Sequence, residues 1–252
     1  YPRRQAMPLR EELERQGAWL FRWRSYFPLV MLPVMLMALR DAGYLERYLG
    51  RAAQLAWEVF CLLVSFAGLG IRCMTIGYTH LGTSGRNTKA QRAEALNTTG
   101  MYSLVRHPLY VGNFFIFLGM ALFIEVWWFA LLSVLAYWMY YERIIIAEEE
   151  FLRGKFGAPF VEWAERTPLI IPKFKNWKNP ELPFSLKKIL RAEYNAFLLI
   201  IVTMAILDVL GVAFTQGRWK LDKLWAIALA DGFAIFLFLW ILRKKTSIMD
   251  VK

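Results

Sequence analysis

Long apolar blocks separated by short charged segments dominate the sequence. Six such blocks cover residues 19–39, 55–71, 109–125, 126–147, 196–214 and 224–242. A helix needs roughly 20 residues to cross the hydrocarbon core of a bilayer. The first block is the weakest candidate, because Arg22 and Arg24 interrupt it. The pattern predicts an all-α, polytopic membrane helix bundle with about six transmembrane helices.

Composition and charge agree with this interpretation. Of the 252 residues, 58% are hydrophobic, a share that is too large for an ordinary soluble domain, and the net charge is +11. The charged start of the chain (residues 1–16) does not resemble a cleavable signal peptide. With a cytoplasmic amino terminus, the outside segments 40–54 and 215–223 hold only six of the 31 Lys and Arg residues. We therefore expect an inner-membrane protein with both termini in the cytoplasm and without a nucleic-acid partner.

The apolar stretch from Leu109 to Tyr141 is too long for one span. Its only Asp, Glu, Lys, Arg, Asn or Gln residues are Asn113 and Glu125. A single helix of this length would extend about 50 Å, against a hydrocarbon core of about 30 Å. The pattern therefore predicts a helical hairpin that turns near Glu125. Proline is well tolerated in the first helical turn, so Pro108 is expected to begin the first arm.

This hairpin would bring two charged motifs to the same membrane level. Arg106 and His107 precede its first arm, and the sequence "ERIIIAEEE" (residues 142–150) follows its second arm. Taken alone, the first motif is typical of an anchor beside lipid head groups and the second of a solvated helix end. Their predicted proximity favours a shared site at the cytoplasmic surface.

The same residues carry a family resemblance. The motifs "LNTTGMYSLVRHPLYVGN" and "ERIIIAEEEFLRGKFGAPFVEWAERTPLIIP", within residues 96–172, resemble the isoprenylcysteine carboxyl methyltransferase family, with phospholipid methyltransferases as relatives. The resemblance implies S-adenosylmethionine bound at the cytoplasmic helix ends and a lipid substrate that enters from the bilayer. It also implies a set of cofactor-binding residues: Gly100, Tyr102, Arg106, His107, Pro108, Tyr110, Glu148 and Glu149. The implied catalytic residues are Arg143, near the substrate channel, and Arg106.

The chemistry of these side chains is compatible with that cofactor. Glu148 and Glu149 suit an ammonium group or ribose hydroxyls, and Arg106 with His107 suits a carboxylate. Arg143 could orient a nucleophile that is already ionised. We therefore favour an anionic oxygen as methyl acceptor, either a lipid phosphate such as that of lipid A or a lipid or prenylcysteine carboxylate. A basic belt follows the motifs and indicates either ordinary positive-inside bias or recruitment of anionic head groups: Lys173, Lys175, Lys178, Lys187, Lys188 and Arg191.

The sequence divides into three regions. Residues 1–95 hold a cytoplasmic segment and two spans, residues 96–172 the methyltransferase core, and residues 173–252 a two-span extension. Within the extension, residues 179–195 read as a basic amphipathic segment on the membrane surface. Asp208 and Asp231 are expected to lie at one membrane depth inside the two spans.

Other functions remain open at this point. A sterol-type reductase on a related fold would bind NADPH at the same helix ends, and a scaffold or transporter would have no catalytic role. The two cysteines, Cys61 and Cys73, are interpreted as packing residues, and no metal site is expected. The sequence does not indicate an oligomeric state.

Overall fold

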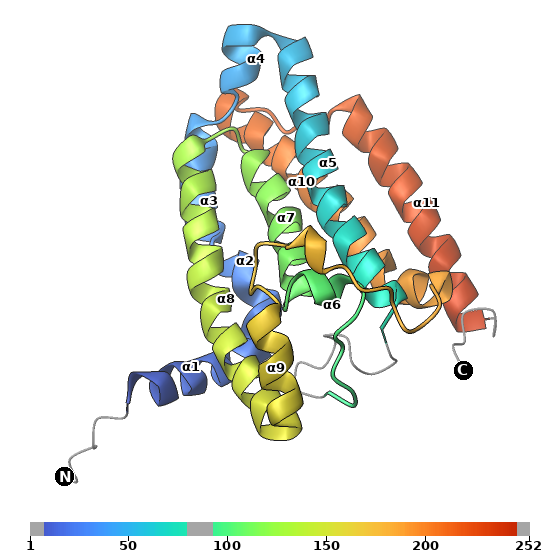
Figure 1. Ribbon diagram of the computed structural model, residues 1–252. Coiled ribbons are helices and arrows are strands. Elements are labelled where there is room, and N and C mark those ends of the chain that lie inside the picture. The colour runs from blue at the N-terminus through green and yellow to red at the C-terminus, as the bar shows by residue number, and fades with distance from the viewer. Residues whose placement is uncertain (1–7, 80–92, 246–252) are drawn as a thin grey trace.

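The computed structural model describes residues 8–79 and 93–245, and within them every regular element is a helix (Figure 1). This confirms the predicted all-α bundle. The elements are α1 (Leu9–Trp23), η1 (Arg24–Tyr26), α2 (Phe27–Val30), α3 (Leu32–Ala38), η2 (Leu39–Asp41), α4 (Tyr44–Leu49), α5 (Arg51–Gly77), α6 (Met101–Leu104), α7 (Pro108–Leu122), α8 (Trp127–Phe156), α9 (Ala158–Arg166), η3 (Phe174–Asn176), α10 (Leu186–Gln216) and α11 (Lys223–Lys245). Five helical segments in this part of the chain are long and apolar enough to cross a membrane, and α7 adds a shorter apolar helix.

The first predicted span is broken rather than continuous. The α-helix ends at Trp23, the short η1 follows, and proline stands at the start of both α2 and α3. Proline lacks the N–H that a continuing helix would use, so each one favours a new start. In Figure 1, α1 projects from the lower end of the bundle, whereas α3 runs beside α8.

The hairpin of α7 and α8 forms as predicted. Pro108 is the first residue of α7, and the turn contains Glu125 with a φ of 65°. The Glu125 carboxylate accepts a hydrogen bond from the Leu45 backbone N–H at 2.9 Å, which ties the turn to α4. The first arm packs closely on α5, because a Cβ added at Gly68 would lie 2.4 Å from the Gly112 carbonyl oxygen. Small residues at such contacts let membrane helices approach each other closely.

The carboxy-terminal extension differs from two predictions. Helix α10 begins at Leu186 and continues through the span, so residues 186–195 are its first turns and not a separate surface segment. Asp208 accepts a hydrogen bond from the backbone N–H of Asp222, just before α11 begins. Asp231 lies nine residues farther on, about 13 Å along α11, and its side chain is exposed. The prediction of one shared depth is wrong, because the connection after Gln216 returns to the level of Asp208 before α11 starts.

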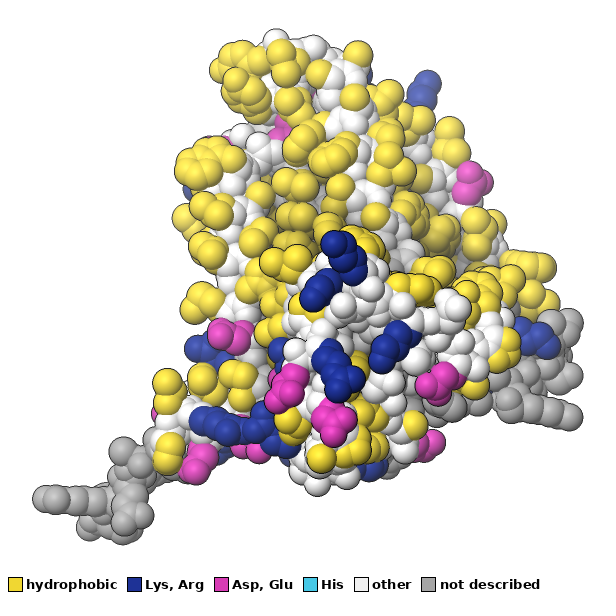
Figure 2. Space-filling view, in the orientation of Figure 1, with side chains coloured by type: hydrophobic (Ala, Val, Ile, Leu, Met, Phe, Trp, Pro, Cys, Tyr) yellow, Lys and Arg dark blue, Asp and Glu magenta, His cyan; other side chains and the backbone are white. Residues whose placement is uncertain are grey.

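Apolar side chains cover most of the face seen in Figure 2, whereas Lys, Arg, Asp and Glu side chains gather toward its lower part, over the region of α1 and α9. Such a segregated surface, together with the long apolar helices, identifies an integral membrane protein. The charged motifs lie at the charged end of the bundle.

Candidate functional site

The two charged motifs are in direct contact. Arg106 Nη1 lies 2.9 Å from the Glu149 carboxylate. His107 Nε2 lies 3.1 Å from Glu149 Oε1, and its Nδ1 lies 3.6 Å from Glu148 Oε2. The hairpin therefore brings together the two motifs that were predicted, from the length of the apolar stretch, to lie at one membrane level.

Local backbone structure positions the first motif. Val105 is extended, His107 is the N-cap of α7, and Pro108 begins the helix. The Arg106 backbone N–H donates to the Pro168 carbonyl oxygen at 2.9 Å, which fixes the residue between α6 and α7. Its side-chain Nε is buried without a hydrogen-bond partner among the described residues. A buried donor without a partner is costly, so this atom favours an acceptor supplied by a ligand.

His107 is a buried side chain held between two carboxylates. Burial lowers the pKa of the imidazole, but the hydrogen bonds and charges of Glu148 and Glu149 outweigh burial and raise the pKa above its ordinary value. The ring also stacks on Tyr110, with centroids 5.6 Å apart. The group of His107, Glu148, Glu149 and Arg106 thus combines two cations with two carboxylates when the histidine is protonated.

Gly100 and Tyr102 lie on the segment that leads into this group. Gly100 has φ 58° and ψ −132°, a conformation in which a side chain would be strained. The Tyr102 carbonyl oxygen accepts a hydrogen bond from Trp163 Nε1 at 3.1 Å, which joins α6 to α9. Burial and the nearby Glu148 raise the pKa of the Tyr102 phenol, so it stays neutral.

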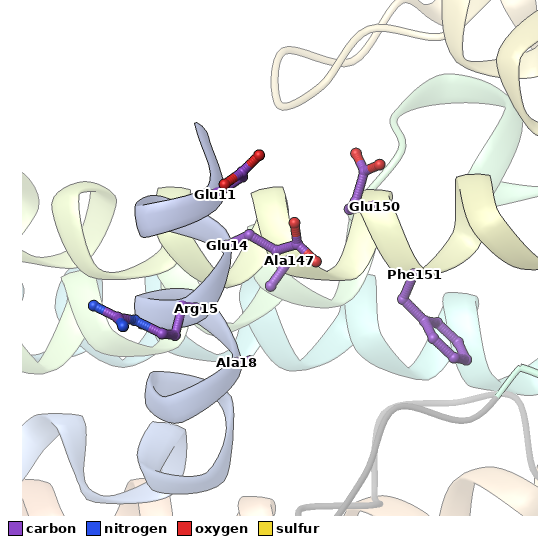
Figure 3. Close-up of a pocket in the computed structure, with 7 residues that line it drawn as sticks. All are labelled: Glu11, Glu14, Arg15, Ala18, Ala147, Glu150 and Phe151. Atoms are coloured by element: carbon purple, nitrogen blue, oxygen red, sulfur yellow. The ribbon is translucent and has the colours of Figure 1, made fainter. Parts of the chain in front are cut away.

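The third glutamate of the acidic run faces another way. Glu150 pairs with Arg10 and lines a cavity of about 450 Å³ between α1 and α8. Figure 3 shows Glu11 and Glu14 from α1 beside Glu150, with Phe151 at one side of the cavity. Successive helical residues are about 100° apart, which separates Glu150 from the two glutamates at His107.

Arg143 does not join the charged group in this structure. Its Nε donates to Gln16 Oε1 at 3.1 Å, and its Nη1 donates to the Met139 carbonyl oxygen at 2.6 Å. Both contacts place the side chain at the interface of α8 with α1. Helices α1 and α8 pack closely at this interface, because a Cβ added at Gly17 would overlap the Arg143 carbonyl oxygen.

Two arginines near the site were not identified from the sequence. The Arg24 guanidinium lies 4.0 Å from the centre of the Phe21 ring, and its charge acts on Glu148 and Tyr110. Arg72, near the carboxy-terminal end of α5, donates a hydrogen bond to Asn113 on α7. An ionisable residue beside or inside a span needs partners, and this signal could have identified both positions.

Sequence comparisons show that the region of the site is similar to a known family. Residues 56–159 match the family model described as phospholipid methyltransferase. Over this region, which is less than half of the chain, the sequence is similar to that family. The match includes most of the candidate site, from Gly100 to Glu149, and it confirms the resemblance inferred from the motifs. No solved structure matches the chain.

Several curated proteins are similar to parts of the chain. The cobalt-zinc-cadmium resistance protein of Cupriavidus metallidurans is 34% identical over 119 residues, which cover 46% of this chain and 52% of that protein. Protein-S-isoprenylcysteine O-methyltransferase of Schizosaccharomyces pombe is 33% identical over 95 residues, or 38% of this chain and 39% of that enzyme. The enzyme of the same name from Saccharomyces cerevisiae is 30% identical over 124 residues, covering 48% and 51%. These matches span about half or less of the relatives' lengths.

No group of three or more His, Cys, Asp or Glu residues in the described ranges 8–79 and 93–245 is placed to hold a metal ion. His80 lies outside these ranges, as do the cations of residues 85–92.

Proposed function

We propose that this protein is an S-adenosylmethionine-dependent methyltransferase that acts on a membrane lipid at the cytoplasmic end of the α7–α8 hairpin. The observation that carries the proposal is the contact of Arg106 and His107 with Glu148 and Glu149, inside a region of a methyltransferase family. The proposed location is the inner membrane, with both termini in the cytoplasm.

The residues present fit this cofactor. Arg106 offers a buried Nε donor to the carboxylate of the methionyl group, and Glu148 and Glu149 offer acceptors to its ammonium group or to the ribose hydroxyls. Tyr102 and Tyr110 provide neutral aromatic walls around them. When bound, S-adenosylmethionine supplies an electrophilic methyl group on its sulfonium. The task of the chain is to bind, to orient and to exclude water, since positioning accounts for much of the acceleration in such displacements.

The proposed acceptor is an anionic oxygen of a lipid, either a phosphate such as that of lipid A or a carboxylate. An ionised oxygen needs no general base, whereas it does need a cation that orients it. Arg143 and Arg24 are the candidates, because both lie on the side where α1 and η1 meet α8. Two relatives are named Protein-S-isoprenylcysteine O-methyltransferase, which supports an oxygen acceptor.

Two measurements test the proposal. Isothermal titration calorimetry on the detergent-purified, folded protein should detect S-adenosylmethionine and its demethylated product, and it should detect no binding of NADPH. Transfer of a labelled methyl group into a total membrane lipid extract, followed by mass identification, should then reveal the acceptor. A folded protein that binds neither form of the methionine cofactor would overturn the proposal.

A further inference from the structure

The segment 168–178, which we name the strap, lies directly against the candidate cofactor segment. Its backbone makes three hydrogen bonds to residues 100–106. The Arg106 N–H donates to the Pro168 oxygen at 2.9 Å, the Lys173 N–H to the Leu104 oxygen at 3.0 Å, and the Gly100 N–H to the Lys178 oxygen at 2.9 Å. The Lys178 N–H also donates to Ser103 Oγ at 3.0 Å. The main chain of the strap is therefore fixed, and its outward side chains are held in place.

Those outward side chains combine cations with large apolar groups. Lys173, Lys175 and Lys178 are exposed, and residues 168–178 contain no Asp or Glu. Their ammonium groups make no hydrogen bond or ion pair with any residue that the structure describes. Phe174 and Trp177 stand between these lysines along the sequence, and Ile171 precedes them; the exposed fractions are 80% for Ile171, 77% for Phe174 and 43% for Trp177.

The strap lies beside the point at which the apolar helix α7 begins. Its hydrogen-bond partners Leu104 and Arg106 immediately precede Pro108, where the apolar helix α7 begins. In Figure 1, η3 lies beside α6 at that end of the bundle, and Figure 2 shows Lys and Arg side chains next to apolar ones on the same face. At this depth, aromatic rings sit among lipid head groups, and lysines meet their phosphates.

We propose that the strap is a docking surface for the anionic phospholipids of the cytoplasmic leaflet. Ile171, Phe174 and Trp177 enter the head-group boundary, while the three lysines neutralise lipid phosphates. Ordinary positive-inside bias would explain lysines at any place on the cytoplasmic side. It does not explain their alternation with exposed aromatic and aliphatic side chains on a segment whose backbone is fixed to the core. The lipid at this surface is bulk anionic phospholipid and not the methyl acceptor.

The test measures lipid binding without any methyl transfer, so its result is independent of the proposed enzymatic function. Native mass spectrometry of the full chain in detergent would compare apparent affinities for phosphatidylglycerol and phosphatidylcholine. The test variant is the triple substitution K173Q/K175Q/K178Q. Each lysine near an anionic surface contributes about a fivefold preference, so the variant should lose up to roughly 100-fold of the preference for phosphatidylglycerol.

Two further variants make the result decisive. The triple substitution R47Q/R218Q/K220Q removes the same charge from exposed positions on α4 and on the connection between α10 and α11, at the opposite end of the bundle, and should retain the preference. The variant K173R/K175R/K178R keeps the charges and should also retain it. Equal loss in both glutamine variants would overturn the proposal, as would an unchanged preference in the strap variant.

Discussion

Arg72 on α5 donates two hydrogen bonds to Glu193 on α10, from Nε at 2.9 Å and from Nη2 at 2.7 Å. Its remaining Nη1 donates to Asn113 Oδ1 on α7 at 2.5 Å. The Glu193 side chain is only 4% exposed. One arginine therefore joins the carboxy-terminal extension to the two helices that frame the candidate site, and α10 acts as part of the core.

This pair predicts a large loss of stability on removal of one partner. Glu193→Ala leaves the Arg72 guanidinium buried without its carboxylate, which costs about 3–5 kcal/mol. The melting temperature of the detergent-solubilised protein should fall accordingly. Tyr194→Phe, at the next residue of α10, is the matched control, because it removes a hydrogen bond from Arg243 on α11 and leaves Arg72 untouched. Equal melting temperatures for Glu193→Ala and the wild-type protein would contradict a structural role of the extension.

Arg106 predicts a second outcome, at the level of cofactor affinity. Arg106→Lys retains the positive charge but removes the buried Nε that has no partner. A hydrogen bond to a charged group contributes about 1.5–3 kcal/mol, so S-adenosylmethionine should bind roughly tenfold more weakly or worse. Calorimetry measures this directly. Arg153→Lys, at an exposed position near the end of α8, should leave the affinity unchanged. Wild-type affinity in Arg106→Lys would show that the donor faces no ligand.

The sequence indicates the hairpin and the candidate cofactor motifs because both depend on local chemistry and on length. The apolar stretch around Glu125 is longer than one span, and Pro108 marks a helix start. The number of residues on each side of the turn therefore predicts that His107 and Glu149 lie at the same level. The depth of Asp231 could not be obtained in this way, because it depends on how far the connection after α10 returns. The contacts of Arg143 with α1 depend on the break at Arg24, which rearranges helices that are distant in sequence.

The raised pKa of His107 predicts a pH dependence of stability. A folded-state pKa above the unfolded value means that protonation stabilises the folded state. The contribution is fully present below the unfolded pKa of about 6.5 and is lost as the pH rises through the higher folded-state value. His107→Gln keeps a polar side chain and cannot titrate. The melting-temperature gap between the wild-type protein and this variant should be largest below about pH 6.5 and shrink at alkaline pH. A gap that grows with pH would indicate that the neutral imidazole is the favoured form.

Gly100 predicts the cost of a backbone conformation. At φ 58° and ψ −132°, an alanine would be strained by about 1–3 kcal/mol, and its Cβ would lie 3.3 Å from Pro180. Gly100→Ala should lower the melting temperature and weaken cofactor binding, because the strap and α6 meet at this residue. Gly70→Ala, in the middle of α5 with open space around it, should be neutral or slightly stabilising. Equal effects of the two substitutions would show that the backbone at Gly100 relaxes freely.

Arg143 gives the prediction that separates acceptor orientation from cofactor binding. Its guanidinium contacts Gln16 and the Met139 carbonyl oxygen, away from the Arg106–Glu149 pair. Arg143→Ala should therefore leave the affinity for S-adenosylmethionine within about twofold of the wild-type value. Loss of a charged hydrogen bond to the acceptor should lower kcat/KM for methyl transfer by roughly tenfold or more. The control Gln16→Ala removes only the α1 partner of Arg143, so a purely structural role would give both variants the same modest loss. A large loss confined to Arg143→Ala would identify it as a catalytic residue that touches the acceptor.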